Sequence, residues 1–186
     1  MSLLILGLAV FFAIHLLPSA PRLRERLLSG LGAERYRLIF ATVAILGFLL
    51  IVIGKSRAPF EFLYVPPVWG RHATMLLVLI AMILLSASHM PSNLKRLTPH
   101  PMLWATILWA IGHLLANGDV ASVLLFGGFL VFAVLGIASA NRRGARPATE
   151  AVPYRRDLIV VAAGVVIYLV FIGLHQTLFG VPVLRL

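Results

Sequence analysis

The stretch MLWATILWAIGHLLANGDVASVLLFGGFLVFAVLGIASA, from Met102 to Ala140, contains two long apolar runs separated by only Asn-Gly-Asp (117–119). Backbone N–H and C=O groups must be paired in hydrocarbon, so long apolar runs without polar alternation are typical of membrane helices. Asn117-Gly118 is typical of a helix C-cap and Asp119 of a helix N-cap. The stretch therefore predicts two membrane helices joined in a tight antiparallel hairpin.

The whole chain has the composition of a membrane protein. Of its 186 residues, 61% are hydrophobic and 12% are charged, and its mean hydropathy is +1.01. A soluble protein needs less apolar core and a more charged surface. We therefore expect one integral-membrane domain over residues 1–186. The absence of cysteine excludes disulfides, iron–sulfur clusters and cysteine-based zinc sites.

Six apolar runs have roughly the length that spans a membrane as a helix. The predicted fold is therefore all-α, a polytopic membrane bundle of about six transmembrane helices. Several runs hold only about 15 to 18 residues, roughly 22 to 27 Å of helix, against a hydrocarbon core of about 30 Å. Flanking residues are expected to enter the membrane interface. The predicted spans are Leu3 to Leu17, Leu38 to Gly54, Ala73 to Ser88, Met102 to Ala116, Val120 to Ala140 and Leu158 to Leu178.

The distribution of positive charge predicts the orientation of these helices. Twelve of the 16 Lys and Arg residues lie in the first, third and fifth loops, on one side of the predicted membrane. Cytoplasmic loops carry the excess of Lys and Arg, so both termini are placed on the outer, periplasmic side. The same loops account for the net charge of +10, and the expected partner is the lipid bilayer rather than a nucleic acid.

The first two loops have different local signals. In the first loop, four leucines follow a helical spacing among arginines, namely Leu23, Leu27, Leu28 and Leu31. This pattern fits either a short helix on the inner membrane face or a plain basic loop. In the second loop, PFEFLYVPPVWG, the prolines argue against a helix.

Carboxylate chemistry inside the membrane is excluded by the positions of the six acidic residues. All six lie in loops or at helix ends, which argues against a carboxylate di-iron centre or an acidic proton relay. The H-E-x-x-H, P-loop and G-x-S-x-G motifs are also missing from the sequence.

Histidine is the remaining chemical group of the predicted spans. An unbonded polar group in hydrocarbon costs roughly 2 to 7 kcal/mol, so each deep histidine needs a partner. The alternatives are a metal, a haem iron, a backbone carbonyl or a side chain of a neighbouring helix. Six histidines lie within or at the ends of the spans, namely His15, His72, His89, His100, His113 and His175.

Predicted depth separates two of these histidines. His15 lies near the inner end of the first span, whereas His113 lies roughly 17 Å along the fourth span from its inner end. Two axial ligands of one haem need nearly equal heights. Straight, upright helices would therefore not let His15 and His113 share one iron.

Several motifs resemble the NnrU family of bacterial membrane proteins and, more distantly, the zeta-carotene isomerases. The similar stretches run through almost the whole chain: FFAIHLLPS with its arginine-rich loop, HPMLWA, LWAIGHLLANGD and LHQTLFGVPV. The resemblance implies a polytopic protein of the bacterial inner membrane, associated with denitrification and nitric oxide metabolism. Other membrane proteins of nitrogen-oxide metabolism are the partners it implies.

The resemblance also implies a cofactor, because the related isomerases resemble haem b proteins with histidine axial ligands. Carried over by motif, His15 in HLLPS and His113 in GHLLANGD are the expected iron ligands, with His89, His100 and His175 as alternatives. The leading expectation is thus a histidine-ligated haem protein. The two alternatives are a haem-dependent cis–trans isomerase of carotenoid-like polyenes and a non-catalytic membrane assembly or structural factor. The sequence leaves open whether the protein is an enzyme.

Overall fold

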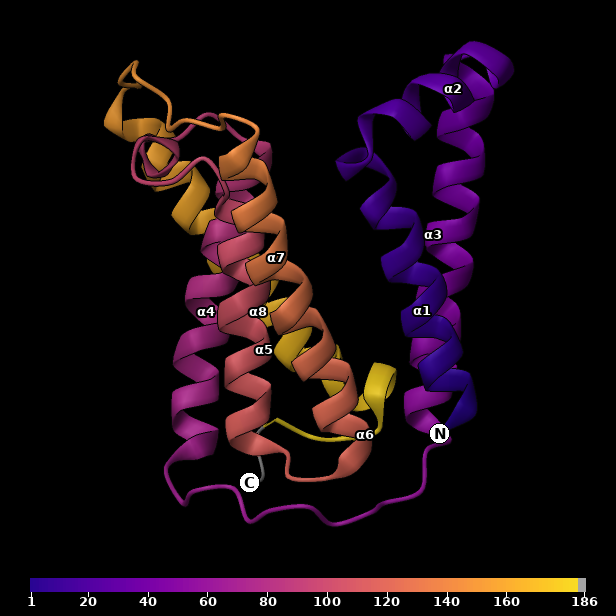
Figure 1. Ribbon diagram of the computed structural model, residues 1–186. Coiled ribbons are helices and arrows are strands. Elements are labelled where there is room, and N and C mark those ends of the chain that lie inside the picture. Colours follow the sequence, from indigo (N-terminus) through magenta and orange to yellow (C-terminus); the bar gives the residue numbers. More distant parts are fainter. Residues whose placement is uncertain (184–186) are drawn as a thin grey trace. The chain divides into compact units, whose positions relative to one another are not determined.

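The computed structural model describes residues 1–183, and this part of the chain is built from helices (Figure 1). Its internal contacts form two compact units. The first unit consists of Met1–Phe62 and Asp119–Gly128, and the second of Leu63–Gly118 with the described residues from Phe129 onward. The expectation of one membrane domain over 1–186 stays a prediction.

The predicted all-α membrane architecture is confirmed. Five helical segments are long and apolar enough to cross a membrane, and a sixth apolar helix, α5, is shorter at 16 residues. The protein is therefore a multi-pass membrane protein. The six segments are α1 (Ser2–Leu16) with its 3-10 extension η1 (Leu17–Ser19), α3 (Ala33–Ser56), α4 (Gly70–His89), α5 (Pro101–Ala116), the continuous segment α6 (Val120–Ser122), η3 (Val123–Gly127) and α7 (Gly128–Arg142), and α8 (Tyr154–Phe179).

The observed helix ends differ most from the predicted ones where polar residues extend a helix beyond its apolar run. The second span begins at Ala33 rather than Leu38, and Glu34 stands in its first turn, where a negative charge suits the helix dipole. As a result α3 has 24 residues and α8 has 26. The predicted shortness therefore applies mainly to α1 and α5.

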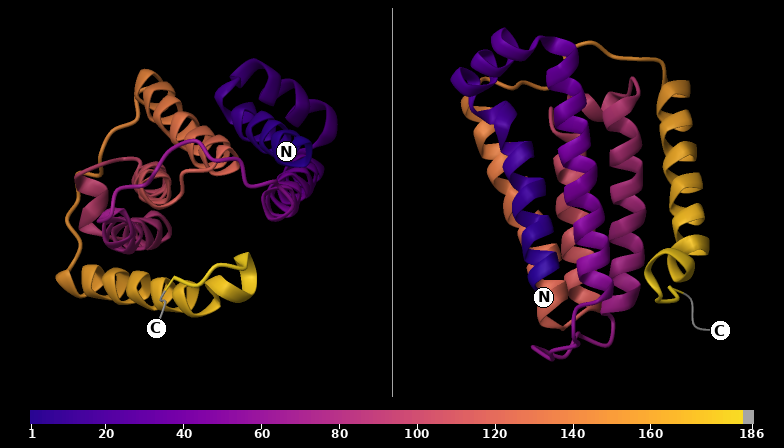
Figure 2. Two further views of the ribbon diagram at one scale, coloured as in Figure 1. Left: turned by 90° about the horizontal axis from the view of Figure 1, so that it is seen from below. Right: turned by 90° about the vertical axis from the view of Figure 1, so that its right-hand side faces the viewer.

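Glycines bring α1 and α3 into backbone contact in the first unit, where the two helices run side by side (Figure 2). A Cβ atom on Gly7 would lie 2.6 Å from the Ile51 nitrogen, and one on Gly47 would lie 3.0 Å from the Phe11 nitrogen. A Cβ on Gly54 would overlap the Leu4 backbone. The partners run in opposite order along the two helices, so α1 and α3 are antiparallel and packed through small residues.

The first loop contains a helix, α2 (Pro21–Leu31), so of the two predicted alternatives the structure has the helix. Leu27 and Leu28 on α2 are half-buried while the arginines are exposed. Gly32 then takes a φ of 78°, which is easily reached only by glycine, and α3 begins at the next residue.

In the second unit α4 packs against both α5 and α8. The Thr74 hydroxyl donates to the carbonyl oxygen of Gly112 on α5 at 2.6 Å. On the other side, a Cβ on Gly164 of α8 would lie only 2.6 Å from the Ile83 Cα. Small residues thus set the helix spacing on both faces of α4.

The helices on either side of the Asn-Gly-Asp turn run antiparallel within the second unit. Leu103 near the start of α5 lies against Gly136 of α7, and Trp109 further along α5 meets the Phe129 ring at 5.5 Å. The predicted antiparallel pairing is confirmed. The segment after the turn is not uniform, because η3 (Val123–Gly127) is a π-helical turn that the sequence did not reveal.

Candidate functional site

His15 lies in the last turn of α1 and is half-buried. Its Nδ1 lies 2.7 Å from the carbonyl oxygen of Phe11, one turn earlier. The Phe11 ring stacks on the imidazole at 4.0 Å, and Phe40 of α3 meets its edge at 5.3 Å. A carbonyl only accepts hydrogen bonds, so Nδ1 carries the proton and Nε2 the lone pair of the neutral ring.

His113 repeats this arrangement in the last turn of α5. Its Nδ1 donates to the carbonyl oxygen of Trp109 at 2.8 Å, and the two rings lie 5.1 Å apart. Trp109 is in turn held by the Phe129 ring. The same tautomer therefore follows, with the lone pair on Nε2.

The shared geometry matches the chemistry of a metal-bound histidine. Metal-ligating histidines almost always donate their other ring N–H to a carbonyl, a carboxylate or water, which fixes the ring and raises its basicity. His15 and His113 both fit this requirement for a haem iron. His15 belongs to the first unit and His113 to the second, so their pairing and their heights stay predictions.

Two of the three alternative ligands, His89 and His175, also have Nδ1 against a backbone carbonyl. The Nδ1 of His89 lies 2.7 Å from the Ser88 hydroxyl and 3.1 Å from the Leu85 carbonyl, and the side chain is exposed. His100 lies at the start of α5, with its Nε2 2.8 Å from the side-chain oxygen of Asn141 at the end of α7. His175 donates to the carbonyl of Val181 at 2.7 Å.

Within residues 1–183, no group of three or more His, Cys, Asp or Glu side chains is placed to hold a metal ion. Haem iron takes only one or two protein ligands, so single histidines are the relevant donors. His100 holds two helices together, which is the structural role that the sequence left as an alternative.

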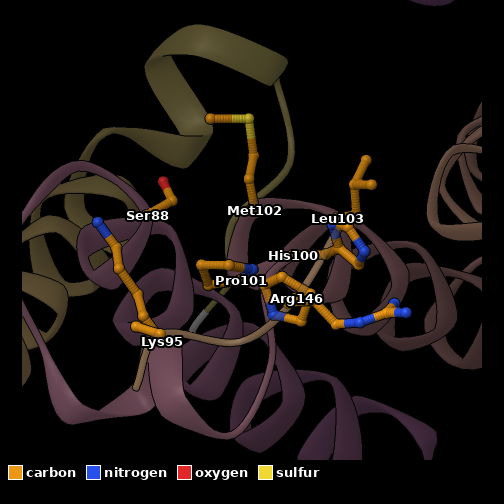
Figure 3. A pocket seen from close by; sticks show the side chains of 9 residues that line it. Ser88, Lys95, His100, Pro101, Met102, Leu103 and Arg146 are labelled. Carbon is orange, nitrogen blue, oxygen red and sulfur yellow. The ribbon is translucent and has the colours of Figure 1, made fainter. Parts of the chain in front are cut away.

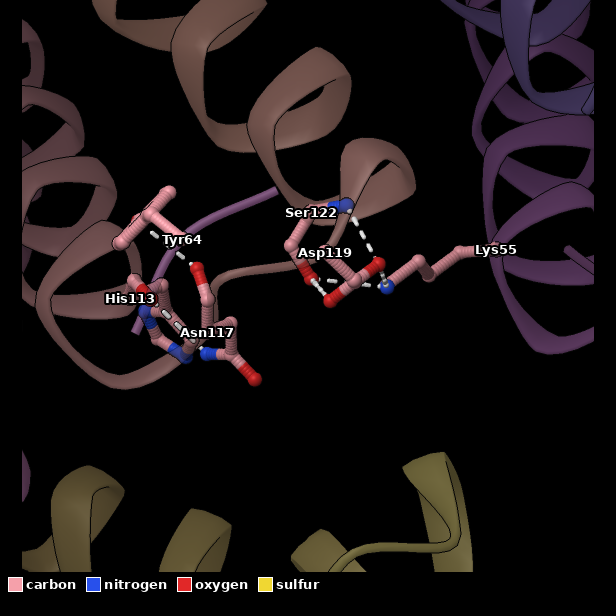
Figure 4. A network of polar contacts seen from close by, with 6 residues as sticks. All are labelled: Lys55, Tyr64, His113, Asn117, Asp119 and Ser122. Carbon is pink, nitrogen blue, oxygen red and sulfur yellow. Dashed lines mark hydrogen bonds and ion pairs between the residues drawn. The ribbon is translucent and has the colours of Figure 1, made fainter. Parts of the chain in front are cut away.

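Tyr64 from the second loop closes the end of α5 beside His113 (Figure 4). Its hydroxyl donates to the carbonyl oxygens of Leu114 and Asn117, at 2.8 Å for Asn117. The Asn117 side chain donates to the His113 carbonyl at 2.9 Å. The Leu114 carbonyl, one of those that the end of a helix leaves without a helical partner, is thereby bonded. The sequence did not reveal this role of Tyr64.

Asn117 is the C-cap of α5, as predicted. Gly118 is needed for another reason, because a Cβ there would overlap the Tyr64 carbonyl oxygen. The backbone N–H groups of Leu63 and Tyr64 both donate to the Gly118 carbonyl, at 2.8 and 3.1 Å. Close approach of the second loop therefore explains this glycine.

Replacing Tyr64 by Phe removes only the hydroxyl. We expect the free energy of unfolding to fall by about 1 kcal/mol, the typical net value of a neutral hydrogen bond. Detergent-solubilised protein titrated with SDS and followed by circular dichroism measures this change. Tyr154→Phe is the matched control, because Tyr154 is 85% exposed. Equal effects of the two substitutions would contradict the capping role.

In the first unit, Asp119 is the N-cap of α6, as predicted. Its Oδ1 accepts from the Ser122 backbone N–H at 3.0 Å, and its Oδ2 accepts from the Ser122 hydroxyl. The Lys55 ammonium, at the end of α3, donates to Asp119 Oδ1 at 2.9 Å and to the Ser122 hydroxyl oxygen at 2.8 Å (Figure 4). Lys55, Asp119 and Ser122 thus form one fully bonded polar network.

Electrostatics within this network favour the charged carboxylate. Burial on its own would raise the pKa of Asp119. Hydrogen bonds from Ser122 and Lys55, together with the positive charge of Lys55, outweigh that effect and hold the pKa below its usual value. The sequence identified the cap but missed Lys55, although the predicted orientation put both residues on the outer side of the membrane.

A comparison with known protein families supports the motif resemblance over nearly the full length. The family model described as NnrU protein matches residues 3–183. No curated protein and no solved structure matches the chain significantly. The matched range includes His15, His113 and the Asn-Gly-Asp turn. The chain therefore belongs to the NnrU protein family.

Proposed function

We propose that this multi-pass membrane protein binds haem b through histidine, with His15 and His113 as the iron ligands. The observation that carries the proposal is the geometry that the two histidines share. Each donates its Nδ1 proton to the carbonyl one turn earlier, at 2.7 and 2.8 Å, and so presents Nε2 as a donor atom for a metal.

The residues around each imidazole support this role. Phe11 and Phe40 hold the His15 ring, and Trp109 holds the His113 ring. Aromatic walls restrict ring rotation and limit access of water, and both factors influence the redox potential of a bound metal. A haem in place would supply one-electron redox chemistry.

Family membership and the distribution of charge support a proposed cellular role. The proposed location is the inner membrane of a bacterium, with the basic loops in the cytoplasm. There the protein would support nitrogen-oxide metabolism, such as denitrification, as the family resemblance implies. The His100–Asn141 contact favours a structural role for His100, so His100 is expected to be dispensable for haem binding.

Haem titration of the purified protein tests this proposal. We expect the wild-type protein in detergent to develop a Soret band, and His15→Ala or His113→Ala to weaken haem binding. The loss should exceed the roughly 10- to 100-fold that is typical when a residue hydrogen-bonded to a metal ligand is removed. His72→Ala is the matched control, since His72 is exposed in the first turn of α4.

Rescue of haem binding by free imidazole distinguishes the loss of an iron ligand from the loss of the fold. His113→Gly should regain the Soret band when free imidazole is added, because imidazole replaces the missing donor. A wild-type protein that never acquires the band would contradict the proposal. So would equal weakening by His72→Ala and His113→Ala.

A further inference from the structure

An open cavity of about 510 Å³ lies in the second unit, between the end of α4 and the start of α5 (Figure 3). Its walls come from α4, from η2 (Asn93–Arg96), from the first turn of α5 and from the loop before α8. Two basic and two apolar side chains are part of the lining, namely Lys95, Arg146, Met102 and Leu103.

Positive charge in this cavity is not neutralised by the chain. The lining includes Lys95 and Arg146 but no Asp or Glu. Within residues 1–183 the salt bridge is between Lys55 and Asp119, far along the sequence from both cations. Among these described residues, the guanidinium of Arg146 donates to the carbonyl of the adjacent Ala145, at 3.2 Å.

Asp157, at the start of α8, is engaged by other residues. The carboxylate of Asp157 accepts from Ser92 and Asn93, with distances of 2.6 to 2.9 Å. Glu150, in the same loop as Arg146, is exposed and does not line the cavity. An anion entering the cavity would therefore meet two cations without a competing carboxylate.

Hydrogen bonds fix the loop that carries Arg146. The Ala148 N–H donates to the Lys95 carbonyl at 2.9 Å. Further along, Val152 and the side chain of Asn93 exchange two hydrogen bonds, at 2.8 and 3.0 Å. Lys95 and Arg146 are far apart in the sequence. These hydrogen bonds keep the segments that carry them beside the same cavity.

The same cavity has an apolar wall. Met102 and Leu103 lie in the first turn of α5, and Met102 is 46% exposed. The N-terminus of α5, which is the positive end of its helix dipole, also lines the cavity. A ligand that fits both features has an anionic head and an apolar tail, which a free phosphate ion lacks.

We propose that this cavity binds an anionic phospholipid, with Lys95 and Arg146 on two sides of its anionic headgroup (Figure 3) and Met102 and Leu103 along the acyl chains. The predicted orientation places the cavity at the cytoplasmic leaflet, which carries anionic lipids. The site is independent of His15 and His113.

Competitive lipid binding tests this site. The full-length protein is purified in detergent, mixed with phosphatidylglycerol, phosphatidylcholine or inorganic phosphate, and analysed for bound lipid by native mass spectrometry. We expect phosphatidylglycerol to bind in preference to phosphatidylcholine. In Lys95→Gln/Arg146→Gln its affinity should fall about 25-fold, since each basic residue near the surface contributes roughly a factor of five.

The matched control is Arg155→Gln/Arg156→Gln, which removes the same charge from exposed residues at the start of α8. It should leave the affinity within about twofold of the wild-type value, because Arg155 and Arg156 do not line the cavity. The charge-retaining variant Lys95→Arg/Arg146→Lys should keep most of the binding.

Three results would overturn the proposal. One is equal binding of the two phospholipids, and another is an equal loss in the two glutamine variants, which would indicate general surface attraction. The third is displacement of phosphatidylglycerol by millimolar-range inorganic phosphate as efficiently as by lipid, which would indicate a site for a soluble anion.

Discussion

Gly54→Ala is expected to lower the free energy of unfolding of the first unit by about 3 kcal/mol, at the upper end of the usual cost of overpacking. A Cβ at this position would overlap the backbone of Leu4. Backbone atoms cannot rotate away as the end of a flexible side chain can, so α1 and α3 must separate to admit the methyl group. SDS titration in detergent, followed by circular dichroism, measures the change.

Gly173→Ala is the matched control for this prediction. Gly173 lies within α8, and a Cβ added there would meet no atom of another element within 4 Å. Alanine is the better helix former by about 1 kcal/mol, so Gly173→Ala should be neutral or stabilising. A Gly54→Ala protein as stable as Gly173→Ala would contradict the backbone contact between α1 and α3.

Asp119→Ala is expected to lower the free energy of unfolding by about 2 to 3 kcal/mol. Loss of a helix N-cap costs about 1 kcal/mol. Loss of the carboxylate also leaves the Lys55 ammonium without its counter-charge, a cost reduced here because Lys55 is 32% exposed. Glu61→Ala is the control, since Glu61 is exposed and its backbone carbonyl, rather than its side chain, bonds to Val120.

A double-mutant cycle isolates the ion pair from the cap. Lys55→Met, Asp119→Ala and the double variant should give a coupling free energy of about 1 kcal/mol, as for residues in one hydrogen-bonded network. Additive effects would show that Lys55 and Asp119 act independently, contrary to the 2.9 Å contact.

The same network predicts a dependence on acid. The folded-state pKa of Asp119 is below the unfolded value of about 3.9. The stabilisation is therefore complete above the unfolded-state pKa and is lost as the pH falls through the folded-state pKa. Unfolding measured between pH 7 and pH 3 should show a smaller acid destabilisation in Asp119→Ala than in the wild-type protein.

Much of the architecture could be predicted because few backbone structures can pair all of their polar groups inside a bilayer. Each apolar run had to become a helix to pair its polar groups, and each did. Polar residues such as Glu34 gave no hydropathy signal, so the start of α3 was placed too late. The π-helical turn at η3 has no simple pattern of apolar periodicity and stayed hidden.

The candidate site was predictable in its residue types but not in its contacts. Phe11 and Trp109 each precede their histidine by four residues, a spacing that brings side chains together on one helix face. That signal was present in the sequence. Lys55 and Asp119, by contrast, are 64 positions apart, and only the fold brings them together. The same holds for Lys95 and Arg146 around the cavity.

The most direct test of the haem proposal is a reduced-minus-oxidised absorption spectrum of the protein purified from bacterial membranes. We predict the bands of haem b in the wild-type protein and in His72→Ala, and their loss in His15→Ala and His113→Ala. Wild-type protein without haem bands, both as purified and after haem is supplied, would contradict the account. Bands of full intensity in the two ligand variants would contradict the assignment of His15 and His113.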